Sequence, residues 1–162
     1  SGWKNAVFSI GVGMNTIPVA YDDMGIHYRH NSLDSEYGAI VNSMLKHIKL
    51  GFGHASEFAS YDVRAGRMTR REAAAIAKRL DGNCHERYVQ SFCSWIGISE
   101  NEFWNVANSY RGNMWSLGRE GGWTLNQAVW DEYHDVESIN TDEVIKRVDT
   151  IRATERTKAQ LV

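Results

Sequence analysis

Apolar residues recur at intervals of three and four through the middle of the chain, the spacing that places side chains on one face of an α-helix. The first such run predicts a helix over residues 35–52, with its stripe at Tyr37, Ile40, Val41, Met44, Leu45, Ile48 and Phe52. Gly51 and Gly53 interrupt the run and indicate a kink or a close approach of two backbones. A second helix is predicted over residues 55–65, because Gly66 is the type of residue that commonly follows a helix end.

Two capping signals predict where further helices begin. Thr69 stands three residues before Glu72, and Ser99 stands three residues before Glu102. This is the spacing of a capping box, in which the hydroxyl and the carboxylate satisfy each other's free backbone donors. A helix at about residues 85–95 lies between these two signals. The middle of the chain is therefore predicted to be a series of short, well-delimited helices.

After residue 112 the apolar pattern shortens to the alternation of β-strands. The stretch "MWSLGREGGWTLN" places Trp115 and Leu117 before a glycine-rich turn, and Trp123 and Leu125 after it. This pattern predicts a two-stranded hairpin within residues 114–126. A lone hairpin is marginally stable in water, so we expect it to pack against the helices through its tryptophans.

The C-terminal segment, residues 131–162, is predicted to form an amphipathic helix that runs from Asn140 to Gln160. Asn140 or Thr141 is its expected N-cap. Its apolar stripe is thin and comprises Val144, Ile145, Val148 and Ile151. A stripe this thin indicates packing on another chain or domain, so a homo-oligomer formed through residues 140–160 is a candidate assembly.

Together these patterns predict a mainly α fold: a compact multi-helix bundle with a short β-hairpin and an irregular or extended N-terminal segment. The N-terminal segment is residues 1–31, which mix β-branched residues with glycines and hold the only proline. The helical core with its hairpin is residues 32–130. The remaining residues, 131–162, are the C-terminal amphipathic helix.

Composition and charge exclude several function classes. The formal net charge of -2 creates no field that would draw the whole molecule onto nucleic acid or an anionic membrane. No apolar run approaches the ~20 residues that span a bilayer, and two cysteines are too few for a disulfide scaffold. We therefore expect a cytoplasmic protein. His27 and His30 have no acidic or thiol partner at ligand spacing, so no metal site is predicted.

A run of cations surrounds the junction between the second and third predicted helices. Arg64, Arg67 and Arg70 stand where one helix ends and the next begins at Thr69. Helix ends offer free backbone donors, and guanidinium groups bind phosphate bidentately. This corner is therefore a candidate site for a phosphate or diphosphate, with Arg64, Arg67 and Arg70 or Arg71 as its cations. The alternative is that these arginines pair with nearby acidic residues as a solvated surface.

Several motifs in one collinear order resemble the C-terminal region of the N-acetyl sugar amidotransferases, enzymes of bacterial O-antigen and related glycan synthesis. The matching motifs are "SLD" at 32–34, "IKLGFG" at 48–53, R-x-G-x-x-T-R at 64–70, "DG" at 81–82 and "ISENEFW" at 98–104. The resemblance covers half to two thirds of the chain. Two positions depart from the family pattern: His54 stands where an arginine is usual, and Phe58 where an acid is usual.

The resemblance implies a specific reaction for the full-length enzyme. Such enzymes are similar to ATP-pyrophosphatases, which activate an amide oxygen of a nucleotide-linked sugar, and ammonia from a glutamine-hydrolysing partner then produces an acetamidino group. ATP and Mg²⁺ are the cofactors expected of the full-length enzyme. The "SGG-x-DS"-like loop that binds ATP is absent from this sequence. The chain therefore resembles the helical, substrate-side part of such an enzyme, with no catalytic residue assigned to it. The resemblance implies that Arg64, Thr69 and Arg70, beside Arg67, bind the diphosphate of the sugar nucleotide.

A function of another class stays open on the same residues. The basic corner and the thin-striped tail also suit a non-catalytic helical module that serves oligomerisation or docking of a partner. Nucleic-acid binding is disfavoured because a protein that follows a phosphate backbone usually has a basic face of wider extent.

Overall fold

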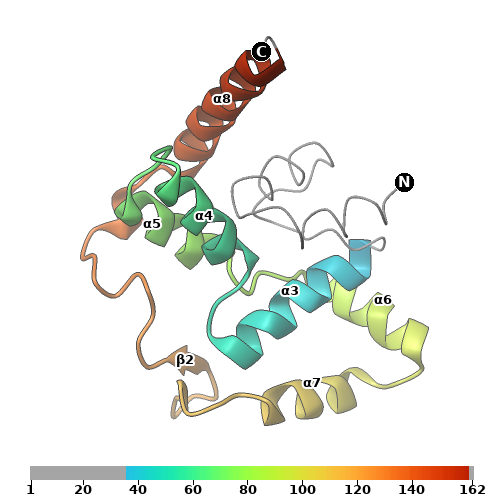
Figure 1. The fold of residues 1–162 in the computed structure, drawn as a ribbon. Helices are drawn as coiled ribbons and strands as arrows, with labels where there is room; N and C mark the ends of the chain where they lie inside the picture. The colour runs from blue at the N-terminus through green and yellow to red at the C-terminus, as the bar shows by residue number, and fades with distance from the viewer. Residues whose placement is uncertain (1–35, 161–162) are drawn as a thin grey trace.

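The computed structural model describes residues 36–160, which form six α-helices, one two-stranded hairpin and a short 3-10 helix (Figure 1). In chain order these are α3 (Glu36–Leu50), α4 (His54–Arg64), α5 (Arg70–Leu80), α6 (Glu86–Ile96), α7 (Glu100–Ser109), β1 (Trp115–Leu117), β2 (Trp123–Leu125), η1 (Val136–Ser138) and α8 (Thr141–Gln160). The predicted mainly α fold with a hairpin is confirmed. The prediction of an irregular or extended segment at 1–31, with His27 and His30, lies outside the described residues.

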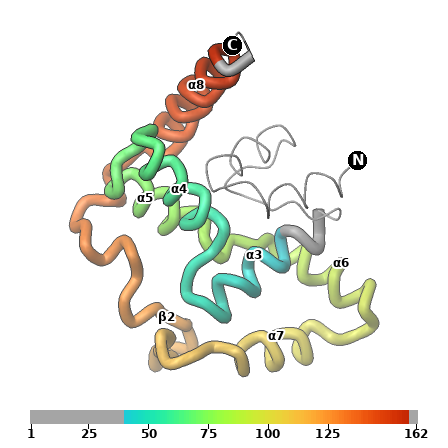
Figure 2. The backbone as a smooth tube through the Cα atoms, in the orientation of Figure 1, coloured from blue at the N-terminus to red at the C-terminus, as the bar shows by residue number. Residues whose placement is uncertain are grey.

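The helices pack as two groups of three, each around its own apolar core. Helices α4, α5 and α8 enclose Ala55, Phe58, Ala59, Met68, Ile76, Val144 and Val148. Helices α3, α6 and α7 enclose Val41, Met44, Ile48, Val89, Cys93, Phe103 and Ala107. The tube in Figure 2 crosses between the groups three times: from α3 to α4, from α5 to α6, and from α7 through the hairpin and η1 to α8.

The predicted stripe of the first helix is buried over most of its described length. Val41, Met44 and Ile48 are core residues. The helix ends at Leu50, two residues earlier than the stripe implies, because Gly51 adopts the left-handed conformation with φ 74°. Phe52 consequently lies past the helix end, where its side chain is 41% exposed. Its place in the stripe was therefore wrong.

Local hydrogen bonds explain why the central helices start where they do. The Glu72 backbone N–H donates to Thr69 Oγ1 at 3.2 Å, and the Thr69 N–H donates to Glu72 Oε2 at 2.8 Å. The capping box predicted at the start of α5 is therefore confirmed. At α7 the Glu102 N–H donates to Ser99 Oγ at 3.2 Å. The return bond from the Ser99 N–H to the Glu102 carboxylate is not formed between these two described residues, so the second box is only half formed.

The α3–α4 and α5–α6 connections meet at a close contact. Gly53 precedes α4, and a Cβ atom there would lie 2.5 Å from Asp81 Oδ1, closer than real Cβ contacts. The Asp81 carboxylate in turn accepts hydrogen bonds from the backbone N–H and the hydroxyl of Ser56. The close approach near Gly53 is thus a contact of its backbone with the Asp81 side chain, and not of two backbones as the sequence indicated.

An ion pair across the same connection gives a pH-dependent contribution to stability. Lys46 of α3 pairs with Glu57 of α4. A hydrogen bond with the His54 ring, aided by Lys46 and opposed by partial burial, lowers the pKa of Glu57 to about 2. The folded pKa lies below the unfolded value of about 4.3. The stabilisation is therefore complete above pH 5 and is lost as the pH falls toward 2.

We expect Glu57→Gln to remove about 1 kcal/mol of stability at pH 6, a figure reduced for solvent screening of this partly exposed pair. Urea denaturation of both proteins from pH 6 to pH 3 measures the difference, which should shrink as the pH falls. Glu120→Gln, at an exposed position in the hairpin turn, is the matched control. A wild-type advantage that stays constant down to pH 3 would contradict the assignment.

The hairpin is antiparallel, with Trp115 opposite Leu125. Trp115 packs edge-on against the His47 ring of α3, with the ring centroids 5.3 Å apart. Burial lowers the pKa of His47; the Asp81 carboxylate opposes this shift and the Arg111 charge adds to it. The Arg111 guanidinium lies 4.4 Å from the Trp115 ring and 5.1 Å from Trp123. The prediction that the hairpin packs on the helices through its tryptophans is confirmed at Trp115.

Helix α8 packs its apolar stripe inside the chain. Asn140 is the N-cap that the structure selects, because its side-chain oxygen accepts from the Glu143 N–H at 3.4 Å. Val144 and Val148 are buried against α4 and α5. Figure 1 shows the C-terminal part of α8 extending beyond the other two helices. An oligomer formed through residues 140–160 stays a prediction.

Candidate functional site

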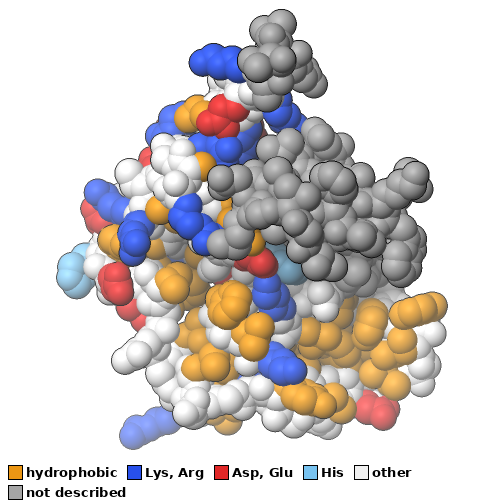
Figure 3. All heavy atoms as spheres, viewed as in Figure 1, with side chains coloured by type: hydrophobic (Ala, Val, Ile, Leu, Met, Phe, Trp, Pro, Cys, Tyr) orange, Lys and Arg blue, Asp and Glu red, His pale blue; other side chains and the backbone are white. Residues whose placement is uncertain are grey.

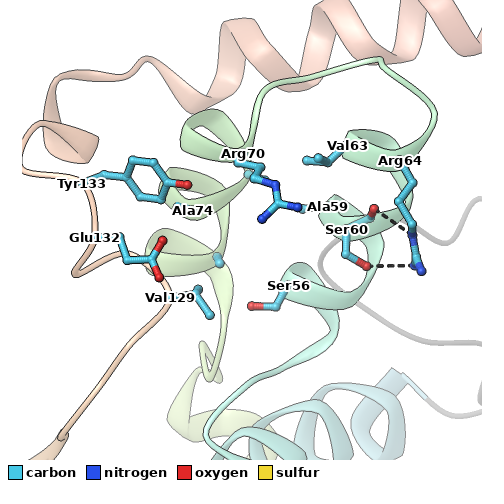
Figure 4. Close-up of a pocket in the computed structure, with 12 residues that line it drawn as sticks. Ser56, Ala59, Ser60, Val63, Arg64, Arg70, Ala74, Val129, Glu132 and Tyr133 are labelled. Carbon is cyan, nitrogen blue, oxygen red and sulfur yellow. Dashed lines mark hydrogen bonds between the residues drawn. The ribbon is translucent and has the colours of Figure 1, made fainter.

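A pocket of about 470 Å³ lies among α4, α5 and the segment that precedes η1 (Figure 4). This volume is within the range of small-molecule sites in proteins. The alanines of the two helices form its floor, since small side chains leave space between α4 and α5. Its lining comprises Ser56, Ala59, Ser60, Val63, Arg64, Arg70, Ala73, Ala74, Ala77, Val129, Glu132 and Tyr133.

Arg64, the last residue of α4, provides one cation at the edge of the pocket. Its Nε donates to the Ser60 carbonyl and its Nη2 to the Ser60 hydroxyl, both at 3.2 Å. The guanidinium carbon also lies 4.8 Å from the centroid of the Tyr61 ring. These contacts hold an exposed guanidinium in one place, which lowers the entropy lost when it binds an anion.

Arg70, the first residue of α5, provides a second cation. Figure 4 shows its side chain extending toward Ala59 and Ser60 of α4. Arg70 is exposed and has no ionic partner among residues 36–160. The N-terminus of a helix also carries a partial positive charge, and this charge reinforces the side chain. Arg64 and Arg70 thus bring two positive groups from two different helices to one pocket.

The opposite wall of the pocket comes from the segment between the hairpin and η1. Glu132 and Tyr133 project from this segment toward α5, as Figure 4 shows. The segment is anchored because Trp130 and Tyr133 pack against a cluster of Ala74, Ala75 and Val136. The pocket therefore has arginines at one side and a carboxylate with an aromatic ring at the other.

Comparison with known families identifies the larger part of the chain. The family described as LPS biosynthesis protein WbpG-like, C-terminal domain, matches residues 27–129, well over half of the sequence. The chain belongs to this family. The resemblance inferred from the motifs is therefore confirmed at the level of a C-terminal region in lipopolysaccharide biosynthesis. No curated protein and no solved structure matches the chain.

The WbpG-like match includes Arg64 and Arg70 but ends at Val129. One part of the pocket therefore lies inside the matched residues, and the other part lies outside them. The arginine side and the alanine floor belong to the matched domain. Glu132 and Tyr133 of the opposite wall lie beyond it.

The other two residues predicted for the site, Thr69 and Arg67, make contacts outside the pocket. The Thr69 hydroxyl caps α5, where it accepts from the Glu72 N–H. Arg67 does not line the pocket, because its Nη1 donates to Asp62 Oδ1 at 3.1 Å and its Nη2 to Glu155 Oε2 at 2.7 Å. Burial acts to lower the pKa of Arg67, but these two carboxylates outweigh it and raise the pKa. The alternative of an arginine paired with a nearby acid therefore holds at Arg67.

A buried ion cluster between α4 and α8 was missed from the sequence. Asp62 is fully buried, and Arg152 of α8 is 5% exposed. Arg152 Nε donates to Asp62 Oδ1 at 3.2 Å and Nη2 donates to Oδ2 at 2.7 Å. The sequence spacing places Arg152 on the buried face of α8, because it follows Val144 and Val148 at intervals of four residues. A charged residue on the apolar side of a helix indicates a buried partner.

The arrangement suits binding and positioning of a ligand. Its two guanidinium groups can hold a phosphate or diphosphate, and its carboxylate can accept hydrogen bonds from hydroxyl groups. Within residues 36–160 no three side chains of histidine, cysteine, aspartate or glutamate gather as a metal site. None of the helices in that range is long and apolar enough to cross a membrane.

Proposed function

We propose that this WbpG-like domain binds the nucleotide-linked N-acetyl sugar for an ATP-dependent amidotransferase, which converts the N-acetyl group to an acetamidino group. The observation that carries the proposal is that Arg64 and Arg70, from two different helices, both line one pocket. A diphosphate carries the complementary charge, and two guanidinium groups can contact its two phosphates. The family's place in lipopolysaccharide biosynthesis supports a sugar nucleotide as the substrate class.

The chemical step belongs to other parts of the proposed enzyme. The sequence has no "SGG-x-DS"-like loop, so its residues do not fit ATP and no step through ATP is assigned to them. ATP and Mg²⁺ are expected on the part of the full-length enzyme that carries this loop. Ammonia is expected from a glutamine-hydrolysing subunit. The contribution of this chain is to hold the substrate in a fixed orientation, which lowers the entropic part of the barrier.

Titration of the chain with UDP-N-acetylglucosamine by calorimetry tests the proposal. We expect Arg70→Ala and Arg64→Ala each to lower the affinity about tenfold or more, because each removes charge-assisted hydrogen bonds to phosphate. Arg119→Ala, at an exposed position in the hairpin turn, is the matched control and should leave the affinity unchanged. Binding that both pocket variants leave untouched would overturn the proposed site.

A partner-docking module is the second candidate function, and a different surface favours it. An apolar groove of about 510 Å³ lies among α3, α6 and α7. Ile96, Val106 and Tyr110 line it and are 43%, 53% and 60% exposed. Figure 3 shows hydrophobic side chains gathered over this part of the surface. Contiguous exposed apolar area is typical of interaction surfaces. Light scattering at high concentration tests whether the chain associates through such a surface.

A further inference from the structure

The wall of the pocket formed by residues 129–133 is held rigidly on α5. Trp130 and Tyr133 pack against the cluster of Ala74, Ala75 and Val136. Two ion pairs flank this contact: Arg71 with Asp135, and Lys78 with Glu137. The segment has no regular secondary structure over these residues, yet it is fastened to one helix at several points. Its side chains therefore keep a defined position relative to the arginines.

The polar groups of this wall are available for a ligand. Glu132 is exposed, and its carboxylate has no hydrogen-bond or ionic partner among residues 36–160. The Tyr133 hydroxyl has none within the same range, although the ring is half-buried. In Figure 4 both side chains extend from one side of the pocket, while Ser60, Arg64 and Arg70 lie at the other.

The two sides of the pocket select different chemistry. A carboxylate repels phosphate, so Glu132 disfavours an anion at its own side, whereas the arginines favour one at theirs. Between them the alanine floor offers apolar surface and little polar contact. The pocket therefore fits a ligand with a phosphate at one end and hydroxyl groups at the other. A sugar nucleotide has this distribution of groups.

We propose that Glu132 and Tyr133 recognise the sugar of the nucleotide-linked substrate and determine which sugar the domain accepts. A carboxylate accepts charge-assisted hydrogen bonds from neighbouring hydroxyls, and an aromatic ring packs against the apolar face of a pyranose. A site that hydrogen-bonds a substrate hydroxyl discriminates strongly against an analogue in which that hydroxyl is misplaced. This inference rests on the proposed function of the same pocket.

The two sides of the pocket lie in different parts of the chain. The arginine side lies inside the matched WbpG-like residues, and Glu132 and Tyr133 lie beyond them. A phosphate group is common to all sugar nucleotides, whereas the sugar differs from one to the next. The residues that bind the common group and those that read the variable group therefore fall in separate parts of the chain.

Calorimetry with three ligands on the full chain tests the assignment. The ligands are UDP, UDP-N-acetylglucosamine and its C4 epimer UDP-N-acetylgalactosamine. With Glu132→Gln we expect the affinity for UDP to stay within about twofold of wild type, while the better-bound sugar nucleotide loses about tenfold and the preference between epimers shrinks. Tyr133→Phe should reduce the same preference with its ring retained. Glu120→Gln is the control, and circular dichroism confirms folding of each variant.

Three outcomes distinguish the two proposals. Loss of the sugar-dependent affinity alone supports the role of Glu132. An equal loss for UDP and for both sugar nucleotides, or no loss at all, overturns the specificity role while Arg64 and Arg70 retain theirs. Absence of binding for all three ligands in the wild type overturns the proposed function and the specificity role with it.

Discussion

Replacing Asp62 with asparagine should lower the free energy of unfolding by about 3 to 5 kcal/mol, because it leaves buried arginine charge without its counterion. Asp62 is fully buried and accepts hydrogen bonds from both Arg67 and Arg152. Asparagine has nearly the same volume as aspartate, so the substitution creates no cavity. The loss of stability therefore comes from the lost charge and the changed hydrogen bonds. Urea denaturation followed by circular dichroism measures it.

Two further variants identify the cause of this loss. Asp149→Asn is the matched control: its carboxylate lies 4.0 Å from Arg152 Nη1 but is 49% exposed, so we expect a change below about 1 kcal/mol. The double variant Asp62→Leu with Arg152→Met should recover more than half of the loss, since removing a buried pair costs less than splitting it. An effect of Asp62→Asn no larger than that of Asp149→Asn would contradict the assignment.

The ion cluster also bears on the candidate site. Asp62 lies two residues before Arg64, so the contact of Asp62 with Arg152 fixes the last turn of α4 against α8. Asp62 and Glu155 neutralise the charges of Arg67 and Arg152. No acidic side chain among the described residues neutralises Arg64 or Arg70 at the pocket. The basic run in the sequence therefore divides into structural arginines and arginines available to a ligand.

Local signals in the sequence were sufficient to predict most of the helices. The capping box at Thr69 and the left-handed glycines Gly66 and Gly97 act within a few residues of the chain, so their effect is visible without tertiary structure. The helices predicted over residues 55–65 and 85–95 accordingly differ from α4 and α6 by a single residue at each end. Phe52 was misplaced because apolar spacing continued past the glycine that ends α3.

Contacts between distant segments were not predicted, for a physical reason. Arg67 was grouped with the site because a local pattern of cations does not reveal a carboxylate such as Glu155, 88 residues away. Glu132 and Tyr133 gave no signal because they stand in an irregular segment without hydrophobic periodicity. The packing of Trp130 and Val136 on α5, together with the ion pairs of Arg71 and Lys78, brings that segment to the pocket.

A charge placed in the apolar stripe of α8 should strongly destabilise the protein. We expect Val148→Asp to lower the free energy of unfolding by more than about 4 kcal/mol. Val148 is fully buried in the core formed with α4 and α5. An aspartate there would be a buried, unpaired charge, and such a charge is strongly unfavourable away from water. Thr150→Asp, at an exposed position of the same helix, is the control and should change stability by less than about 0.5 kcal/mol. Urea denaturation measures both.

The protein concentration used in that experiment separates packing within one chain from packing between chains. Val148 packs against Phe58 and Ile76 of its own chain, so the urea midpoint of the wild type should be the same at low and at high concentration. If the stripe were instead buried between two chains, dissociation would accompany unfolding and the midpoint would rise with concentration. A rising midpoint that Val148→Asp abolishes would therefore assign α8 to an oligomer and contradict the intramolecular core.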